Sequence, residues 1–353
     1  MIYALKRNYE REILHFVAMK SANSQLGLVL TGGGAKGAYQ VGALQYIAEL
    51  GLEPQIIAGT SIGALNGAVL SAYRPFPNAV QHLNQLWDRL SHAEILRPNT
   101  GAVLQTLSYA TQAFTPTLRI WLHDFLVAEG FMQDSNAIFD PTPIEKLLRA
   151  TVKPYELQRG IELWVTVFPS LKIPGLGYDW LVDFIRARTG TDAHWLCIQE
   201  CTDDETVYKL LLASAALPLV FPSQEVNGQS YVDGGLADNV PLRALAKRGC
   251  KNVIVIHLQN GAVWNRYNFP EQTVIEIRPQ EKLEKFDTPL ISKIVSYLDF
   301  SSERITKLKN RGYEDAKRCL IPIIKTLKTV EDQRQSHNSL VNSTQRLLND
   351  PPL

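Results

Sequence analysis

Two glycine-rich turns lie close together near the start of the chain, and each one stands between a short apolar run and a helical pattern. The first turn, at residues 31–37, has the sequence TGGGAKG, and the second, at residues 59–63, has the sequence GTSIG. Residues 26–30 and 56–58 are apolar runs typical of buried strands, and apolar or small residues at helical spacing follow each turn. The sequence therefore predicts two consecutive strand–turn–helix units over residues 26–72. Parallel neighbouring strands would place both turns at the same end of a sheet.

The second turn has the form Gly-x-Ser-x-Gly, with Ser61 between Gly59 and Gly63. A serine on a sharp turn from strand to helix projects its hydroxyl from the edge of a sheet, and glycines are needed because the turn is strained. The first turn supplies backbone N–H groups at the start of a helix, where they can hold a developing oxyanion. The two turns together indicate acyl transfer.

A nucleotide cofactor is the main alternative reading of the first turn. Gly32, Gly34 and Gly37 match the spacing of the dinucleotide-binding fingerprint, which also requires an acidic residue at the end of the second strand. Residues 58–61 have the sequence AGTS and supply no carboxylate for a ribose. A phosphate-binding Walker loop is excluded too, because Lys36 precedes a glycine rather than serine or threonine. We therefore expect no cofactor.

The composition of the chain argues against several other classes of protein. Its 353 residues are 45% hydrophobic and 20% charged, as in ordinary globular domains, and the net charge of +1 gives no field that would attract nucleic acid. The four cysteines show no disulfide-like spacing, and the cluster of His194, Cys197 and Cys201 lacks the second pair of a zinc site. We expect no metal, no nucleic-acid partner and a reducing, cytoplasmic location. No apolar run is long enough to predict a membrane-spanning helix.

A serine nucleophile needs a base, and two arrangements fit the order of residues along the chain. Asp233 follows a β-type run at residues 230–232 and precedes two glycines, a pattern that is also typical of a simple turn. His257 ends a buried strand, so Ser61, then Asp233 or Asp238, then His257 would fit the triad of an α/β-hydrolase. That fold usually meets its nucleophile after several strands rather than at the second, which favours Asp233 alone.

Three motifs in this order resemble those of the patatin-like phospholipase family: residues 32–37, residues 59–63, and the Asp-Gly-Gly at residues 233–235. The segments at 213–222 and 238–241 also match, so the resemblance covers about residues 26–256. It implies a three-layer α/β/α fold with a mostly parallel central sheet. It also implies a lipid acyl hydrolase of the phospholipase A or lysophospholipase type.

The resemblance assigns roles to individual residues. Ser61 would be the nucleophile and Asp233 the general base of a dyad that works through an acyl-enzyme, with no metal and no cofactor. The backbone of the first turn would form the oxyanion hole, namely Gly32, Gly33, Gly34, Ala35, Lys36 and Gly37. The glycines that support the two motifs would be Gly59, Gly63, Gly234 and Gly235.

The expected partner is a membrane phospholipid or another glycerolipid, reached by transient contact with a membrane surface from the cytoplasm. A homo-oligomer is compatible with the sequence. Two alternatives stay open: an esterase with a Ser-Asp-His triad that acts on soluble esters, and a catalytically silent binding module with the family's fold.

The chain divides into three expected parts. Residues 1–25 lack the features of a signal peptide and form a leader or a docking helix. Residues 26–325 form the acyl hydrolase domain, with insertions near 98–135 and 169–193 that we expect to carry substrate choice and regulation. Residues 326–353 form a polar, partly ordered C-terminal tail.

Overall fold

The structure is a computed structural model, which describes residues 25–92, 142–171, 186–187, 190–216, 222–261, 264–283 and 299–349. The insertion expected near 98–135 lies outside the described residues, as do nearly all of the expected leader and much of the insertion expected near 169–193. The division into three parts therefore stays a prediction.

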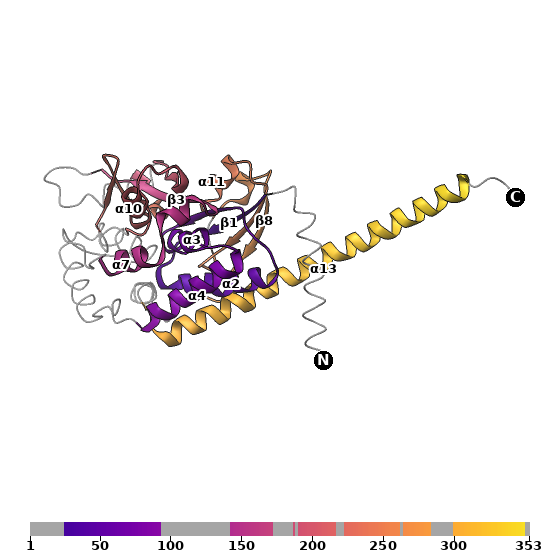
Figure 1. Ribbon diagram of the computed structural model, residues 1–353, viewed down its shortest axis with the longest axis horizontal. Helices are drawn as coiled ribbons and strands as arrows, with labels where there is room; N and C mark the ends of the chain where they lie inside the picture. Colours follow the sequence, from indigo (N-terminus) through magenta and orange to yellow (C-terminus); the bar gives the residue numbers. More distant parts are fainter. Residues whose placement is uncertain are drawn as a thin grey trace, which may run out of the picture.

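An eight-stranded sheet forms the middle layer of the molecule (Figure 1). The strands run in the order β5-β6-β3-β2-β1-β7-β8, and β4 also pairs with β3. The pairs that join β3, β2, β1, β7 and β8 are parallel, whereas β4, β5 and β6 are antiparallel to their neighbours. The strands are β1 (Leu26–Leu30), β2 (Ile56–Thr60), β3 (Glu162–Pro169), β4 (His194–Cys197), β5 (Gln224–Val226), β6 (Gln229–Asp233), β7 (Asn252–Ile256) and β8 (Thr273–Ile277).

Helices cover both faces of this sheet, and most of them lie on one face. The α-helices are α2 (Gly37–Glu49), α3 (Ile62–Ala72), α4 (Phe76–His92), α7 (Thr142–Thr151), α8 (Pro154–Gln158), α10 (Asp204–Ser214), α11 (Leu242–Lys247) and α13 (Ser302–Asn349). Short 3-10 turns include η2 (Gly34–Lys36), η5 (Gly234–Leu236) and η6 (Arg266–Asn268). Within the described residues, no helix is both long and apolar enough to cross a membrane.

The long helix α13 has two halves with different surroundings. Its first half packs against α2 so closely that a Cβ on Gly42 would lie 1.8 Å from the carbonyl oxygen of Lys309, and one on Gly312 would lie 1.9 Å from that of Tyr39. Its second half extends away from the body of the molecule (Figure 1), and nearly every described side chain from residue 325 onward is exposed. The polar stretch that we expected to be a partly ordered tail is therefore helical through Asn349.

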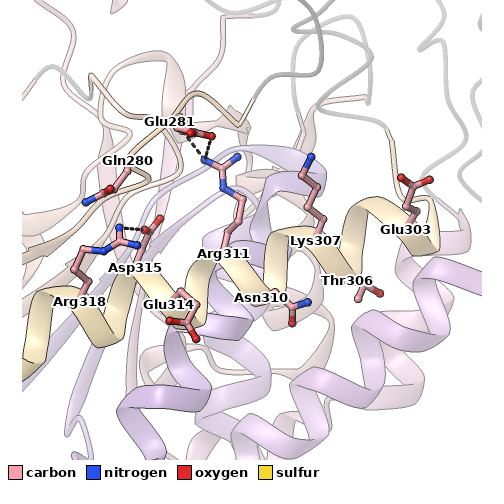
Figure 2. Close-up of a pocket in the computed structure, with 10 residues that line it drawn as sticks. All are labelled: Gln280, Glu281, Glu303, Thr306, Lys307, Asn310, Arg311, Glu314, Asp315 and Arg318. Carbon is pink, nitrogen blue, oxygen red and sulfur yellow. Dashed lines mark hydrogen bonds and ion pairs between the residues drawn. The ribbon is translucent and has the colours of Figure 1, made fainter.

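A polar hollow of about 550 Å³ lies beside the first half of α13 (Figure 2). Arg311 donates to the backbone oxygen of Glu281 across a distance of 3.1 Å, and Arg318 pairs with Asp315 at 2.9 Å. Arg311 thus fastens α13 to the loop that follows β8, whereas the pair of Arg318 and Asp315 lies within α13.

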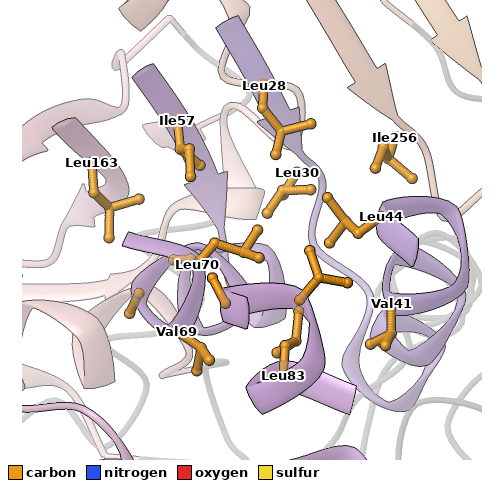
Figure 3. Packing of buried hydrophobic residues seen from close by; sticks show 14 of the residues in the cluster. Leu28, Leu30, Val41, Leu44, Ile57, Val69, Leu70, Leu83, Leu163 and Ile256 are labelled. Carbon is orange, nitrogen blue, oxygen red and sulfur yellow. The ribbon is translucent and has the colours of Figure 1, made fainter. Parts of the chain in front are cut away.

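The core divides at the sheet, and the strands alternate between its two halves. Leu28 and Leu30 of β1 point into the larger core under α2, α3 and α4 (Figure 3), whereas Val29 points into a smaller core under α11. Ile57 of β2 joins the larger core, and Ile56 joins the smaller one. Such alternation follows from the two-residue period of a strand. The predicted three-layer α/β/α fold with a mostly parallel sheet is confirmed.

Candidate active site

Ser61 forms the whole connection between β2 and α3. Its backbone has φ 55° and ψ −128°, in the left-handed half of the Ramachandran map, which a residue with a Cβ enters only under strain. Its carbonyl oxygen accepts hydrogen bonds from Ala64 N at 2.9 Å and Leu65 N at 3.2 Å, which begin the helix. The side chain lies at the edge of the sheet and the residue is 7% exposed. This is the sharp serine turn that the sequence predicts.

The two glycines of the serine turn are required by close backbone contacts. A Cβ on Gly63 would lie 2.2 Å from the carbonyl oxygen of Leu30, so α3 starts directly against β1. A Cβ on Gly59 would lie 2.6 Å from the backbone of Gly63 and Ala64. Real Cβ atoms do not approach other atoms this closely, and the turn therefore needs glycine at both positions.

The serine turn is also fastened to β3. Ser61 N donates to the hydroxyl of Ser214 at 2.9 Å, and that hydroxyl donates in turn to the carbonyl oxygen of Thr166 at 2.7 Å. Ser214 is fully buried at the end of α10. Its hydroxyl thus holds the amide of Ser61 in one position relative to the sheet.

The first glycine turn is a longer loop that leaves several backbone N–H groups without an acceptor. Gly32 N donates to Asn239 Oδ1 at 2.9 Å, and Lys36 N donates to the carbonyl oxygen of Gly33 at 3.2 Å. Among the described residues, the N–H groups of Gly33, Gly34 and Ala35 have no hydrogen-bond acceptor. Gly34 has φ 56°, a value that glycine adopts without strain. The loop therefore offers donors of the kind that an oxyanion hole needs.

The end of β7 braces this loop. Thr31 Oγ1 donates to the carbonyl oxygen of Ile256 at 3.3 Å and accepts from Leu258 N at 3.1 Å. The Leu258 side chain fills the space beside Gly33, where a Cβ would lie only 2.8 Å from it. The first residues of the loop are therefore fixed against the neighbouring strand.

A buried polar network holds the loop from the helical side. Gln40 Nε2 donates to the carbonyl oxygen of Thr31 at 2.8 Å, and Gln40 Oε1 accepts from Asn66 Nδ2 at the same distance. Asn66 Nδ2 also reaches Gly37 O at 3.3 Å, and Trp87 Nε1 donates to Asn66 Oδ1 at 2.9 Å. The network connects both ends of the loop to α2, α3 and α4.

Asp233 is the last residue of β6 and comes level with the serine turn. It pairs with Val167 of β3, one position beyond Thr166, which pairs with Thr60 of β2. Asp233 is 1% exposed, and its Oδ1 accepts from Gly235 N at 2.8 Å. The neighbouring Gly234 crosses β3, where a Cβ would lie 2.6 Å from the backbone of Thr166. In the Asp-Gly-Gly motif, Gly234 therefore leaves room for β3, and Gly235 supplies the N–H that holds Asp233.

One small region brings the predicted residues together. A Cβ on Gly235 would lie 3.1 Å from Asp233 Oδ1 and 3.4 Å from Asn239 Oδ1. A Cβ on Gly32 would lie 2.6 Å from Asn239 Oδ1 and 3.0 Å from Ser61 Cβ. Ser61, Asp233 and the first turn therefore meet around Asn239 at the carboxyl edge of the parallel strands, where α/β sheets bind their ligands.

His257 belongs to a different cluster. Its Nε2 lies 2.9 Å from Glu276 Oε2, and Trp264 Nε1 donates to the same oxygen at 2.9 Å. Burial lowers the pKa of His257, whereas the hydrogen bond from His257 lowers the pKa of Glu276 to about 2. β1 lies between the strand of His257 and the strand that leads to Ser61. This geometry gives a Ser-Asp-His triad no support.

Asp238, the other aspartate of the triad alternative, has a structural role. Its Oδ2 accepts from Trp195 Nε1 at 2.9 Å and its Oδ1 accepts from Val240 N at 3.1 Å. Burial raises the pKa of this carboxyl group. Its backbone oxygen accepts from Thr60 Oγ1 at 3.1 Å, which docks the segment after Asp-Gly-Gly on the serine turn.

The sequence alone predicts no role for Asn239 or Ser214, although each accepts a hydrogen bond from one of the two glycine turns. Both lie in segments that match the family, 238–241 and 213–222. The match of these segments to the family could have pointed to both residues. Their contacts could not be predicted from the sequence, because Asn239 lies 207 positions from Gly32 and Ser214 lies 153 positions from Ser61. A search of the described residues finds no group of acidic, histidine or cysteine side chains that could hold a metal ion.

A family model described as patatin-like phospholipase matches residues 28–246. The chain belongs to the patatin-like phospholipase family. The matched part begins in β1 and ends in α11, and it includes both glycine turns and Asp233.

Curated relatives of this patatin-like chain are much longer proteins. Lysophospholipase NTE1 of Saccharomyces cerevisiae is 24% identical over 254 residues, which cover 72% of this chain and 12% of the yeast protein. Patatin-like phospholipase domain-containing protein 7 of Rattus norvegicus is 27% identical over 236 residues, which cover 65% of this chain and 13% of the rat protein. The aligned part of the patatin-like chain thus spans about an eighth of either relative.

Two solved structures illustrate the matches to the patatin-like chain. Human GIVD cytosolic phospholipase A2 matches the patatin-like chain with a TM-score of 0.45 and 9% identity, covering 91% of this chain and 64% of that one. VipD from Legionella pneumophila matches with a TM-score of 0.40 and 14% identity, covering 85% and 67% respectively.

Proposed function

We propose that this chain hydrolyses fatty-acyl esters of a lipid through a dyad of Ser61 and Asp233. The observation that carries the proposal is the strained serine turn, which lies in one small region with a buried carboxylate and a loop of unpaired N–H groups. The family and the names of the curated relatives support a lipid ester as the substrate.

The proposed reaction has two steps. Asp233 takes the proton of the Ser61 hydroxyl while Ser61 Oγ attacks the ester carbonyl, and the carbonyl electrons move onto an oxygen that the N–H groups of Gly33, Gly34 and Ala35 stabilise. The intermediate collapses, the bond to the alcohol breaks, and Asp233 returns its proton to the departing alcohol. In the second step Asp233 deprotonates a water molecule, which attacks the acyl-enzyme, and the released Ser61 oxygen regains a proton from Asp233.

The position of Asp233 suits this role. The N–H of Gly235 holds Oδ1, which fixes the plane of the carboxylate. The backbone N–H of Asp233 donates to the carbonyl oxygen of Ala216 at 3.0 Å, which fixes the strand end that carries it. A base held in this way loses little entropy on reaching the transition state.

Hydrolysis of a lysophospholipid tests the dyad directly. Ser61→Ala and Asp233→Asn should each abolish release of fatty acid while the far-ultraviolet circular dichroism stays unchanged. Ser343→Ala and Asp332→Asn, on the exposed half of α13, are matched controls and should keep full activity. Full activity in Asp233→Asn would remove Asp233 from the mechanism, and loss of activity in His257→Gln alone would favour the triad.

Covalent labelling separates an enzyme from a silent binding module with the same fold. A fluorophosphonate should label wild-type protein at Ser61, as identified by peptide mass spectrometry, and should leave Ser61→Ala unlabelled. Wild-type protein that resists the probe and releases no fatty acid would support the binding module. The proposal includes transient contact with a membrane surface, which co-sedimentation with phospholipid vesicles measures.

A further inference from the structure

Two hollows of opposite chemistry flank the catalytic loop. The apolar hollow has a volume of about 70 Å³ and lies between α3, α4 and α7. Its walls include Ile62, Leu65, Val69, Leu86, Trp87 and Phe300. The polar hollow has a volume of about 270 Å³ and lies by the start of α11. Its walls include Asp192, Trp195, Asn239, Arg243, Trp264 and Asn268.

The apolar hollow adjoins the last residue of the loop. A Cβ on Gly37 would lie 2.6 Å from the side chain of Ile62 and 2.9 Å from that of Trp87, and both side chains line the hollow. Ile62 also directly follows the nucleophile. Asn66 is one of two polar residues in the wall, and its carboxamide is already bonded to Gln40 and Trp87. Such a wall suits a hydrocarbon chain and offers little to a polar group.

The polar hollow adjoins the first residue of the loop. Asn239, which accepts the hydrogen bond from Gly32 N, is part of its wall. A substrate carbonyl held by the loop would therefore have an apolar hollow beyond Gly37 and a polar hollow beyond Gly32.

Arg243 is the cation in the wall of the polar hollow. Its side chain is 48% exposed and lies 3.6 Å from Asp192, whose side chain is 79% exposed. An ion pair this open to water contributes little, so a ligand can replace either partner. The guanidinium also lies 5.8 Å from the ring centre of Trp195, and Lys247 Nζ lies 4.7 Å from the same centre. Asp238, the other acid in this wall, already accepts hydrogen bonds at both oxygens.

These contacts fit a zwitterionic headgroup. A guanidinium binds a phosphate through charge-assisted hydrogen bonds, and Asp192 beside it can meet the ammonium group. The headgroup would thus replace the weak ion pair between Arg243 and Asp192 with two contacts, one from Arg243 to its phosphate and one from Asp192 to its ammonium group.

We propose that the catalytic loop lies between two subsites: the first few carbons of a single acyl chain enter the hollow beyond Gly37, and a phosphodiester headgroup occupies the hollow beyond Gly32, where Arg243 binds it. This inference rests on the proposed function and narrows the substrate to a lysophospholipid-like ester with one chain and a phosphate. Arg243 is its specificity-determining residue, and Leu65 sets the room for the chain.

The headgroup subsite is tested by comparing two substrates that share one acyl chain. Arg243→Gln should lower kcat/KM for lysophosphatidylcholine about tenfold or more, because it removes a charged hydrogen bond, and should leave monoacylglycerol within about twofold. Both substrates are used as monomers, so that binding to aggregates does not contribute. Arg248→Gln is the matched control, since Arg248 is similarly exposed and pairs with Glu162 outside the hollow. An equal loss with both substrates, or with neither, would overturn the assignment.

Inhibition separates a lipid headgroup from a free anion. Glycerophosphocholine should inhibit wild-type protein competitively and should inhibit Arg243→Gln much less. Inorganic phosphate at matched ionic strength should have little effect, and inhibition by phosphate as strong as that by glycerophosphocholine would assign the hollow to a free anion instead.

The acyl subsite is tested at Leu65 by two changes of opposite sign. Leu65→Phe should fill the hollow and lower kcat/KM for a butyryl ester about tenfold relative to an acetyl ester, whose acyl chain is a single methyl group. Leu65→Ala should enlarge the hollow and raise kcat/KM for a branched isobutyryl ester relative to the acetyl ester. A chain-length profile that both variants leave unchanged would overturn this subsite. Failure of the proposed function looks different, because the wild type would then hydrolyse none of these esters.

Discussion

The two glycine turns follow neighbouring parallel strands and precede helices on the same face of the sheet. One turn nevertheless presents a side chain, and the other presents backbone N–H groups. The turn after β2 consists of Ser61 alone, and its strained backbone presents a side chain at the edge of the sheet. The turn after β1 takes six residues, 31–36, and three of its N–H groups meet no acceptor among the described residues. The length of the connection thus decides whether a strand–helix unit presents one side chain or a set of backbone donors.

The largest expected effect comes from breaking the short turn. A Cβ in Gly63→Ala would lie 2.2 Å from the carbonyl oxygen of Leu30, so α3 must move away from β1. We expect no detectable hydrolysis and a loss of about 3 kcal/mol or more in the free energy of unfolding, measured by urea denaturation. Gly261→Ala is the control, because a Cβ there meets nothing within 4 Å. Wild-type activity in Gly63→Ala would show that the turn tolerates displacement.

The long turn should respond in activity more than in stability. Gly33→Ala places a methyl group 2.8 Å from the side chain of Leu258, which displaces the N–H donors of the loop. We expect kcat to fall about 100-fold with little change in KM, as for the loss of one oxyanion donor. Adding Leu258→Ala makes room for the methyl group and should raise kcat at least about tenfold above that of Gly33→Ala. A double variant no faster than Gly33→Ala would contradict this steric account.

The tie between the short turn and β3 gives a smaller effect. Ser214→Ala removes the acceptor of Ser61 N, and we expect about 1 kcal/mol less stability and roughly tenfold lower kcat. Ser71→Ala removes another buried hydroxyl, which donates to Ile161 O away from the site, and should cost similar stability without loss of kcat. Equal kcat values in the two variants would mean that Ser214 supports only the fold.

The smallest expected effect is a dependence of stability on pH, which arises beside the long turn. His257 lies between Ile256 and Leu258, the two residues that brace the long turn. Burial lowers the pKa of His257, so the unfolded chain binds a proton more readily than the folded chain. Stability should therefore fall as the pH drops below 6.5, and Glu276 should add a further loss as the pH falls from 4.5 toward 2. Urea midpoints measured from about pH 7.5 to about pH 5.5 should decrease less in His257→Gln than in the wild type. Equal slopes would remove His257 as the cause.

The sequence predicts those residues of the site that stand within a short motif, next to the residues that shape their turn. Ser61 and Asp233 each lie between a strand pattern and glycines, and the steric need for those glycines follows from the turn itself. Asn239 and Ser214 could not be assigned in this way, because their contacts join residues more than 150 positions apart. His257 fitted a triad by sequence order alone, and only the strand order shows that β1 lies between it and Ser61.

The fold was predictable to a similar extent. Alternating apolar runs and helical patterns suffice to predict a parallel α/β sheet, and the glycines locate the edge of the sheet where Ser61 and Asp233 lie. The second half of α13 was not predictable from composition, because polar composition reports the lack of a buried face rather than the lack of a helix. Residues 325–349 contain no glycine or proline. Several of their hydroxyls, including those of Thr329 and Ser343, bond to the carbonyl four residues earlier.

The glycine contact between α2 and α13 places the backbone of the C-terminal helix directly against the helix that follows the first glycine turn. Gly42 and Gly312 leave no side chain between the two backbones that could yield under load. α2 begins at Gly37, where the loop ends. The outer half of α13, residues 325–349, extends roughly 37 Å at 1.5 Å per residue. Because the two main chains touch, a force applied along that lever arm would act on α2 at the end of the loop that carries the amide donors.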